Sequence, residues 1–210
     1  MLKHKKSLLI IGSGGHAKAV IDALSSSGKI PLGVIDLNFK NKEEKILGVD
    51  VIGDISLLES YNNNETQVAI AIGDNDKRKE VFFLLKNMDF KVLTVIHHTA
   101  YISKSALIGE GVFVSAGAII NSESNIGDNT IINSGVIVEH ETRIGDHCHL
   151  APGVKIGGRS SVENNSFVGI GSSIANNIKI GRRVIIGAGS VIIQDVETNS
   201  TVVGVGRVVK

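Results

Sequence analysis

Cysteine is nearly absent from this chain of 210 residues, which contains only Cys148. A lone cysteine has no intrachain partner, so a disulfide framework is excluded and a reducing compartment, the cytoplasm, is expected. An excess of charge of one sign is also missing: 22 basic and 21 acidic residues give a net charge of +1, and the one basic run covers residues 3–6. This balance argues against nucleic acid or an anionic membrane surface as the main partner and favours a small metabolite.

Long hydrophobic runs are absent as well. No apolar stretch approaches the roughly 18 residues of a transmembrane helix, and residues 1–6 lead into a predicted strand instead of the apolar core of a signal peptide. The sequence therefore predicts no membrane insertion. Hydrophobic residues make up 42% of the chain, which is enough for internal cores, and the length allows two modest domains.

The chain does contain a hydrophobic repeat with a period of six that begins at Ile102. This period fits neither an α-helix, with 3.6 residues per turn, nor an alternating strand, with two, but it is typical of a parallel β-helix with short flat faces. A β-helix is therefore predicted over residues 98–210. The aliphatic positions are Ile102, Ile108, Val114, Ile120, Ile126, Ile132, Val138, Ile144, Leu150, Ile156, Val162, Val168, Ile174, Ile180, Ile186 and Ile192.

Two smaller patterns accompany the repeat. Two positions before each aliphatic residue the side chain is mostly small or β-branched, as at Ala118, Ser124 and Cys148, which suits a tight corner. Glycine often follows the aliphatic residue, as at Gly109 and Gly145, where it relieves crowding of the backbone.

Residues 1–97 lack this period and read as alternating strands and helices. Such an order predicts a small Rossmann-like parallel sheet covered by helices, that is, an α/β domain. The expected strands are 7–11, 32–35, 67–72 and 92–96, and the expected helices are 16–27, 55–59 and 76–87.

The turn after the first strand carries the pattern Gly12-x-Gly14-x-x-Ala17, and Asp36 follows about twenty residues later. Small residues at a helix N-terminus let backbone N–H groups approach a phosphate, and the helix dipole favours its negative charge. A nucleotide-sugar, a nicotinamide cofactor and a turn without a ligand are all compatible with this pattern. The nicotinamide cofactor is disfavoured because fewer than a hundred residues supply only half of a double Rossmann fold.

The same region resembles the N-terminal domain of bacterial sugar O- and N-acyltransferases of the sialic acid O-acetyltransferase type. The resemblance is carried by the glycine turn with His16, by the second strand ending in Ile35-Asp36, and by the segment Gly73-Asp-Asn75-Asp-Lys-Arg78. Within this hexapeptide-repeat family the chain is most similar to enzymes that N-acetylate a 4-amino sugar on a UDP carrier. The resemblance implies nucleotide-sugar contacts from Gly12, Gly14, His16, Asp36, Gly73, Asn75 and Arg78.

Three histidines lie within ten residues of one another: His140, His147 and His149. A neutral imidazole can take the proton of an attacking amine or hydroxyl, and an adjacent carboxylate can fix its tautomer and raise its basicity. The stretch Val-Glu-His140-Glu141, with a histidine nine residues on, resembles the active-site stretch of the same family. The resemblance implies His140 as general base and Glu141 as its orienting partner, against the alternative of a solvated turn histidine.

The resemblance also implies that the β-helix is left-handed, binds acetyl-coenzyme A and assembles as a homotrimer. It implies a contact of His149 near the thioester and a backbone N–H of Gly158 directed at the thioester carbonyl. It further implies a pantetheine track past Ile170 and Ala188. Asn133, one coil face before His140, is expected to shape the acceptor pocket.

A zinc site is the alternative for the three neighbouring histidines, as in trimeric β-helices of the γ-carbonic anhydrase type. Residues that stack on one face of an 18-residue coil are eighteen apart, whereas these are seven and two apart. We therefore expect no metal, and His147 has no assigned role. His97 and His98 precede the first repeat, and we expect a structural role for them.

Two segments depart from the family pattern. The UDP-sugar enzymes often carry two aspartates after the second strand, whereas Leu37 follows Asp36 here, so the nucleotide is left open. Near the end of the chain, Gly206 stands where the family has proline.

These features predict an acetyl-coenzyme A-dependent N-acetyltransferase that acts on a nucleotide-linked amino sugar in bacterial glycan biosynthesis. Two alternatives stay open. One is O-acetylation of sialic acid or a related sugar on the same scaffold. The other is a non-catalytic, nucleotide-sugar-binding trimeric scaffold.

Overall fold

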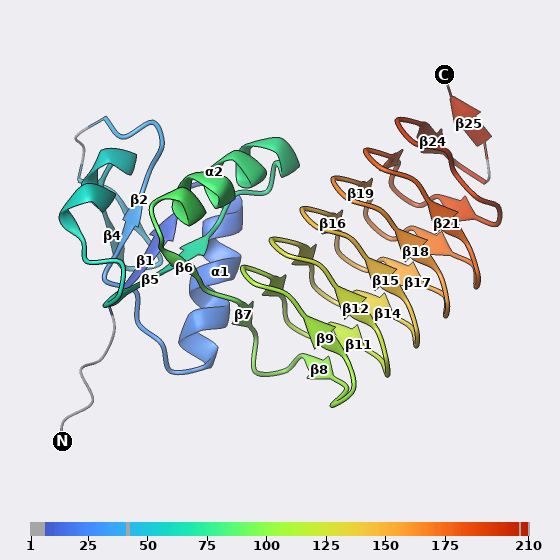
Figure 1. Cartoon of the computed structure of the whole chain (residues 1–210), viewed down its shortest axis with the longest axis horizontal. Helices are drawn as coiled ribbons and strands as arrows, with labels where there is room; N and C mark the ends of the chain where they lie inside the picture. The colour runs from blue at the N-terminus through green and yellow to red at the C-terminus, as the bar shows by residue number, and fades with distance from the viewer. Residues whose placement is uncertain (1–6, 41–42, 206, 210) are drawn as a thin grey trace.

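The computed structural model describes residues 7–40, 43–205 and 207–209 and consists of an α/β domain followed by a β-helix (Figure 1). The basic run at residues 3–6 and Gly206 lie outside the described residues. The α/β domain holds a six-stranded sheet in the order β3-β4-β2-β1-β5-β6. Its strands are β1 (Ser7–Ile11), β2 (Gly33–Ile35), β3 (Lys45–Ile46), β4 (Val49–Gly53), β5 (Thr66–Ile70) and β6 (Lys91–Val92).

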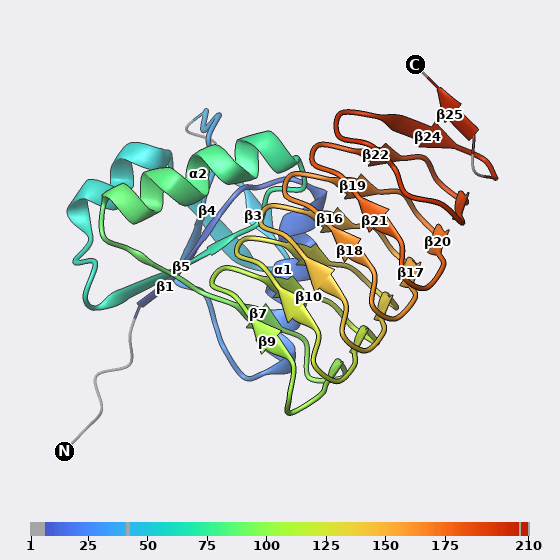
Figure 2. The same ribbon diagram turned by 45° about the vertical axis from the view of Figure 1, so that its right-hand side comes forward.

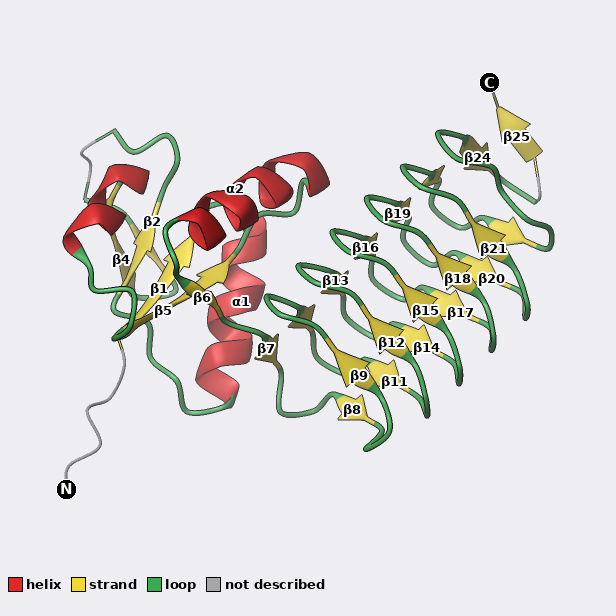
Figure 3. Cartoon of the chain, in the orientation of Figure 1, coloured by secondary structure: helices red, strands yellow, loops and turns green. Residues whose placement is uncertain are grey.

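The central strand β1 supplies both cores of this domain. Successive side chains of a strand point to opposite faces of the sheet. Leu8 and Ile10 therefore pack with helix α1 (Gly15–Ser26), whereas Leu9 and Ile11 pack with helix α2 (Asn75–Asn87) and with the 3₁₀ helix η1 (Ile55–Ser60). Figure 3 shows the helices in red around the sheet. No helix in the described ranges is long and apolar enough to cross a membrane.

The strand expected over residues 92–96 is divided between the two parts of the molecule. β6 pairs with β5 in the α/β sheet, whereas β7 (Val95–Ile96) pairs with β10 in the β-helix. At the crossing, the Thr94 hydroxyl donates to the carbonyl of Gly109 at 2.8 Å. The antiparallel hairpin of β3 and β4 was not predicted, because a two-residue strand is too short to show an alternating pattern.

The second part is a left-handed parallel β-helix of two-residue strands, as predicted. Strands eighteen residues apart pair in register, so that Ile131 lies on His149 and Ile132 on Leu150. The first face contains β7, β10 (Phe113–Val114), β13 (Ile131–Ile132), β16 (His149–Leu150), β19 (Phe167–Val168), β22 (Ile185–Ile186), β24 (Thr201–Val203) and the antiparallel β25 (Arg207–Val209).

The other two faces are shorter. The second face contains β8 (Tyr101–Ile102), β11 (Ile119–Ile120), β14 (Ile137–Val138), β17 (Lys155–Ile156), β20 (Ser173–Ile174) and β23 (Val191–Ile192). The third face contains β9 (Leu107–Ile108), β12 (Asn125–Ile126), β15 (Arg143–Ile144), β18 (Ser161–Val162) and β21 (Lys179–Ile180).

The period-six aliphatic residues form a continuous core along the axis of the β-helix. Small polar residues beside them are buried and paired. The hydroxyls of Ser124 and Thr130 donate to carbonyls of the following coil at 2.9 and 2.8 Å. The glycines that follow the aliphatic residues face the next coil closely, since a Cβ at Gly145 would lie 2.7 Å from the backbone nitrogen of Asn164. The crowding expected from the sequence is therefore real and comes from the neighbouring coil.

Each coil turns at three corners, and the backbone there often has positive φ, which favours glycine and asparagine. The first corner joins the first and second faces, the second corner joins the second and third, and the third corner joins the third and first. The positive-φ residues are Gly117, Gly135, Gly153, Gly171 and Gly189 at the first corner; Glu123, Glu141, Arg159 and Asn177 at the second; and Gly111, Asn129, His147, Asn165 and Arg183 at the third.

The α/β domain packs on the first face of the β-helix. Phe113 and Ile131 share a core with Ala17 and Val20 of α1, and Figure 2 shows α1 beside the first coils. Further along the same face, the outward side chain of Ile185 is 51% exposed. The first face is therefore covered at its early coils and open at its later ones.

Candidate active site

A pocket of about 470 Å³ lies at the carboxyl ends of β1, β2 and β5. In an open parallel sheet such a crevice binds ligands where the strand order reverses, and here the order reverses at β1. Its lining includes five residues that the sequence assigned to substrate binding: Gly12, Gly14, His16, Asp36 and Gly73.

The two glycines of the turn have different roles in this pocket. Gly12 has φ of +108°, and a Cβ there would lie 2.7 Å from the carbonyl oxygen of Ala71, so this glycine shapes the turn. Gly14 caps the N-terminus of α1, and a Cβ there would have no neighbour within 4 Å. The N-terminus of α1 is therefore open to an anionic ligand.

His16 lies between this pocket and the first face of the β-helix. Its ring packs edge-on against Phe113, with ring centres 4.8 Å apart, and its Nε2 is buried without a hydrogen-bond partner in the described structure. Burial lowers the pKa of His16 to about 3, with a smaller effect from His149 and Arg78. The ring is therefore neutral, and its Nε2 is a buried polar atom with no hydrogen-bond partner among the described residues.

Arg78 does not line this pocket, because its side chain is buried in the seam between the two domains. Its Nε donates to the carbonyl of Asn129, and its Nη1 donates to the carbonyls of Ile72 and Gly73 at 3.2 and 2.9 Å. Its Nη2 donates to the Asn75 side chain and to backbone carbonyls of the third corner. All its donors are engaged within the chain, so Arg78 shapes the site by holding the loop after β5.

Asn75 has a similar place in the seam. Its amide nitrogen donates to the carbonyl of Ser166 at 3.2 Å, across the domain boundary. It also lines a second pocket, of about 310 Å³, together with Phe167 and Arg183. The structure therefore does not place Asn75 in the pocket beside the glycine turn.

His149 and Asn133 lie on the first face, next to the loop that Arg78 holds. His149 Nδ1 lies 3.2 Å from the carbonyl oxygen of Gly73, and its Nε2 lies 3.3 Å from the Asn133 amide nitrogen. Burial, and then the charge of Arg78, lower the pKa of His149 to about 4, so the ring is neutral at physiological pH.

His140 and Glu141 lie at the second corner. His140 Nδ1 is 3.0 Å from Glu141 Oε2, and both side chains are about half exposed, at 51% and 47%. A carboxylate only accepts, so Nδ1 carries the hydrogen and Nε2 is left as a base. The ring lies over Gly158 of the next coil, where a Cβ would be 2.7 Å from Nε2. The base and the backbone of Gly158 therefore face the same space.

Gly158→Ala is expected to lower activity by displacing the His140 ring. The backbone itself tolerates a side chain there, because the matching corner positions of other coils are Ser122, His140 and Asn176. We expect turnover to fall by about tenfold or more, part of the roughly 10²–10⁴ that a general base supplies. Steady-state kinetics check this, with the melting temperature as control. Unchanged turnover would show that the ring position does not matter.

The residues expected to contact acetyl-coenzyme A fall into two separate groups. His140 and Gly158 lie at the second corner. Ile170, 60% exposed, and Ala188 lie at the first corner, just before the positive-φ residues Gly171 and Gly189. The second face of the β-helix lies between these corners, so one copy of the chain does not bring the two groups together.

His147 and His97 lie in packed positions. His147 is buried at the third corner, with Nδ1 2.9 Å from the Asn129 side chain and its ring against Phe82 and Phe83. His97 Nε2 lies 3.7 Å from Asp22 of α1. Within the described residues, no three His, Cys, Asp or Glu side chains converge as metal ligands.

Cys148 is buried beside the axis of the β-helix. Its Sγ donates to the carbonyl of Glu163 at 3.1 Å, and burial raises its pKa to about 12. The thiol therefore stays protonated and is not a nucleophile.

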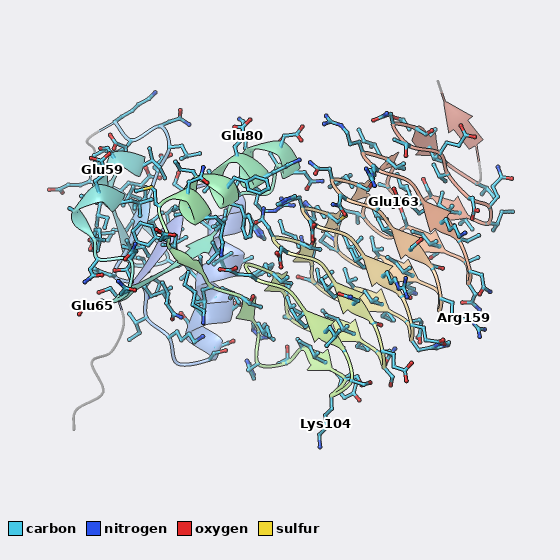
Figure 4. All side chains as sticks on the ribbon, viewed as in Figure 1. Glu59, Glu65, Glu80, Lys104, Arg159 and Glu163 are labelled. Carbon is cyan, nitrogen blue, oxygen red and sulfur yellow. The ribbon has the colours of Figure 1, made fainter. Side chains whose placement is uncertain are left out.

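A basic groove next to Glu141 was missed by sequence reasoning. It has a volume of about 430 Å³ and is lined by Arg143, Arg159 and Lys179 together with Glu123 and Glu141. Arg159, labelled in Figure 4, points outward from the β-helix on the side away from the helices of the α/β domain. The spacing of these residues in the sequence could have predicted the groove, since Arg143 and Lys179 are two 18-residue coils apart on one face.

Comparison with known proteins shows the family to which the chain belongs. The PglD N-terminal domain model matches residues 7–84, and the bacterial transferase hexapeptide model matches residues 123–158 and 159–194. The chain belongs to the family of hexapeptide-repeat sugar N-acetyltransferases with a PglD-type N-terminal domain, as the sequence indicated.

Two solved structures resemble the chain over nearly its whole length. PerB, the perosamine N-acetyltransferase of Caulobacter crescentus in complex with CoA and GDP-perosamine, is 36% identical with a TM-score of 0.89 and covers 94% of each chain. The acetyltransferase domain of PglB from Neisseria gonorrhoeae, in complex with acetyl coenzyme A, is 30% identical with a TM-score of 0.89 and covers 95% of this chain and 97% of that chain.

A curated relative is the UDP-N-acetylbacillosamine N-acetyltransferase of Bacillus subtilis, 34% identical over 116 residues, or 53% of this chain and 52% of the relative. Another is the uncharacterized protein L142 of Acanthamoeba polyphaga mimivirus, 32% identical over 115 residues, or 55% of this chain and 22% of the relative. The matches thus span about half and about a fifth of these curated relatives.

Proposed function

We propose that this protein transfers the acetyl group of acetyl-coenzyme A to the amino group of a nucleotide-linked sugar. The observation that carries the proposal is the His140–Glu141 pair over Gly158 on a hexapeptide coil, in a chain that also has an open helix N-terminus in a sheet-edge pocket. Of the two structures that match nearly the whole chain, PerB is in complex with CoA and GDP-perosamine, and the PglB acetyltransferase domain is in complex with acetyl coenzyme A.

The reaction needs no covalent enzyme intermediate. The sugar amine attacks the thioester carbonyl carbon, and His140 Nε2 takes a proton from the attacking nitrogen. The backbone N–H of Gly158 stabilises the developing oxyanion. The carbon–sulfur bond then breaks, and the protonated imidazole returns its proton to the leaving thiolate, which yields an amide and free coenzyme A.

The two groups of residues expected to contact acetyl-coenzyme A lie at different corners of one chain. This separation supports assembly of the active site between copies of the chain. A neighbour that places its second corner against the first corner of this chain brings His140 and Gly158 to Ile170 and Ala188. A head-to-tail contact of this kind closes into a ring, and the three-sided β-helix suits a ring of three. The second face offers an apolar surface for this contact, with Tyr101 59% exposed and Ile119 and Ile137 partly exposed.

The nucleotide-sugar binds in the pocket at the glycine turn. The N-terminus of α1 binds its phosphates, and Asp36 follows β2 at the edge that serves the ribose or base. His16 lines the same pocket. Asn133 shapes the acceptor side of the first face. We place the protein in the cytoplasm, because its one cysteine is free and buried, as in proteins of a reducing compartment.

The test is a screen of nucleotide-linked amino sugars with acetyl-coenzyme A, in which release of the coenzyme A thiol is followed. We expect thiol release with a UDP- or GDP-linked amino sugar and none with the matching hydroxy sugar. Thiol release with hydroxy sugars alone would replace the proposal by O-acetylation. No release with any acceptor would contradict an acetyltransferase.

Gly14→Val tests whether the nucleotide-sugar binds in the pocket at the glycine turn. The protein has room for a branched side chain there, because no atom lies within 4 Å of a Cβ built on Gly14. The same side chain blocks the approach of a phosphate to the helix N-terminus. The KM for the nucleotide-sugar should rise while acetyl-coenzyme A binding is unchanged. Isothermal titration of both ligands separates this result from global damage, which would weaken both.

A further inference from the structure

A pocket of about 270 Å³ adjoins the pocket at the glycine turn, beyond the end of β2, and we call it the outer pocket. It is lined by Asp36, Asn38, Phe39, Lys40 and Glu44. Asp36 and Asn38 also line the pocket at the glycine turn, so the two pockets meet at these residues. The acetyl transfer uses neither Lys40 nor Glu44, so these side chains are available to bind another part of the substrate.

Asp36 marks the place where the ribose of a bound nucleotide lies. In this class of sheet, an acidic residue that follows the glycine turn by about twenty residues accepts hydrogen bonds from the ribose, while the phosphates lie at the helix N-terminus. Asp36 Oδ1 accepts from the backbone N–H of Asn38 at 2.9 Å, which fixes the carboxylate and leaves Oδ2 for a ribose hydroxyl. With the phosphates at Gly14 and the ribose at Asp36, the base extends away from the glycine turn and into the outer pocket.

The outer pocket offers an aromatic surface and two opposite charges. Phe39 is half-buried and packs against the core that contains α1. Lys40 and Glu44 are exposed. The main chain at Glu44 is held by the sheet, because its carbonyl accepts from the N–H of Val51 in β4 at 2.9 Å. The pocket therefore presents one apolar ring, one ammonium and one carboxylate to a base.

Guanine is the base whose edge matches these groups. Its N1–H and its N2 amino group are neighbouring donors, which the two oxygens of a carboxylate accept together, and its O6 and N7 accept from an ammonium. Uracil has one donor, N3–H, between two carbonyl oxygens that a carboxylate repels. Adenine has an amino donor beside the bare acceptor N1, so it gives a carboxylate only one hydrogen bond.

We propose that the outer pocket is the base site and that Glu44 and Lys40 make the protein selective for a sugar linked to guanosine diphosphate. The proposal rests on the proposed function and names the nucleotide of its substrate. Glu44 accepts from N1–H and the N2 amino group of the base, and Lys40 donates to O6. The ring of Phe39 contacts the face of the base.

Titration of GDP and of UDP into the full-length protein tests the proposal without any acetyl transfer. We expect GDP to bind at least about tenfold more tightly than UDP, since a matched pair of hydrogen bonds to a base edge discriminates by about this factor. In Glu44→Gln the side chain has one acceptor and one donor, which suit N3–H and a carbonyl of uracil. The ratio of the two affinities should therefore fall about tenfold, with weaker binding of GDP and stronger binding of UDP.

Glu43→Gln is the matched control for Glu44→Gln. It removes the same charge one residue earlier, at an exposed side chain that does not line the outer pocket, and should leave the ratio of affinities unchanged. Lys40→Met is the second variant, and it should weaken the binding of GDP more than that of UDP, because only guanine places O6 and N7 on the edge that the ammonium meets.

Several outcomes would overturn the proposal: UDP binding as tightly as GDP, a wild-type ratio in Glu44→Gln, the same change in Glu43→Gln as in Glu44→Gln, or no binding of either nucleotide. The expected preference for GDP, in a protein that releases no coenzyme A thiol with any GDP-linked amino sugar, would overturn the proposed function. The assignment of the base site would stand in that case, because the titration does not depend on acetyl transfer.

Discussion

His140→Ala is expected to lower turnover by about 10²–10⁴, the usual contribution of a general base. The side chain is half exposed and packs on Gly158, so its removal leaves the coil intact. Binding of acetyl-coenzyme A should stay close to that of the wild type. The measurement is kcat under saturating substrates, together with titration of the cofactor into the purified variant.

His98→Ala is the matched control, since His98 is also a histidine at the surface of the chain but lies at the domain junction. It should leave turnover unchanged. If His140→Ala kept more than about a third of the wild-type turnover with chemistry rate-limiting, the general-base assignment would be wrong.

Ile156→Asp is expected to prevent folding of the β-helix. Ile156 is 1% exposed in the axial core, where its neighbours are aliphatic residues of the repeat. An unpaired carboxylate in such a place costs several kcal/mol, which is comparable to the roughly 5–15 kcal/mol that stabilise a whole domain. We expect insoluble protein or loss of the cooperative thermal transition. Ile144→Asp, two strands earlier at 3% exposure, should behave in the same way.

Lys155→Asp is the control within the same two-residue strand. Its side chain points outward and is exposed, so the same new charge should be tolerated within about 0.5 kcal/mol. Circular dichroism, size-exclusion chromatography and thermal melts compare the two variants. Soluble Ile156→Asp with an unchanged melting temperature would contradict the repeat register.

The repeat was predictable because it depends on local geometry. Each two-residue strand directs one side chain at the axis, so a position such as Ile132 must be aliphatic whatever lies far along the chain. The α/β order was predictable for the same reason, from buried strands and the amphipathic α1. The division of residues 92–96 between two sheets was not, because β6 and β7 are two residues each, which is too short to show a pattern, and they pair with different partners.

Some candidate site residues were also predictable from the sequence, and others were not. The pairing of His140 with Glu141 follows from adjacency at a corner, and the open space beside Gly14 follows from a turn before a helix. The burial of Arg78 could not be read from its motif, because its acceptors include carbonyls of Asn129 and Cys148, which are 51 and 70 residues away.

By itself, then, the sequence determined the two folds, the register of the β-helix and the residue types that carry acid–base chemistry, since all of these depend on neighbours within one turn, strand or coil. Only the tertiary structure decided that Arg78 and Asn75 lie in the domain seam and that His149 faces Gly73. It also decided that the two groups of residues proposed to contact acetyl-coenzyme A occupy different corners. The first two of these features depend on how the first face packs against the α/β domain. Such packing is set by shape and hydrogen bonding between segments far apart in the chain, which leaves no periodic signal in the sequence.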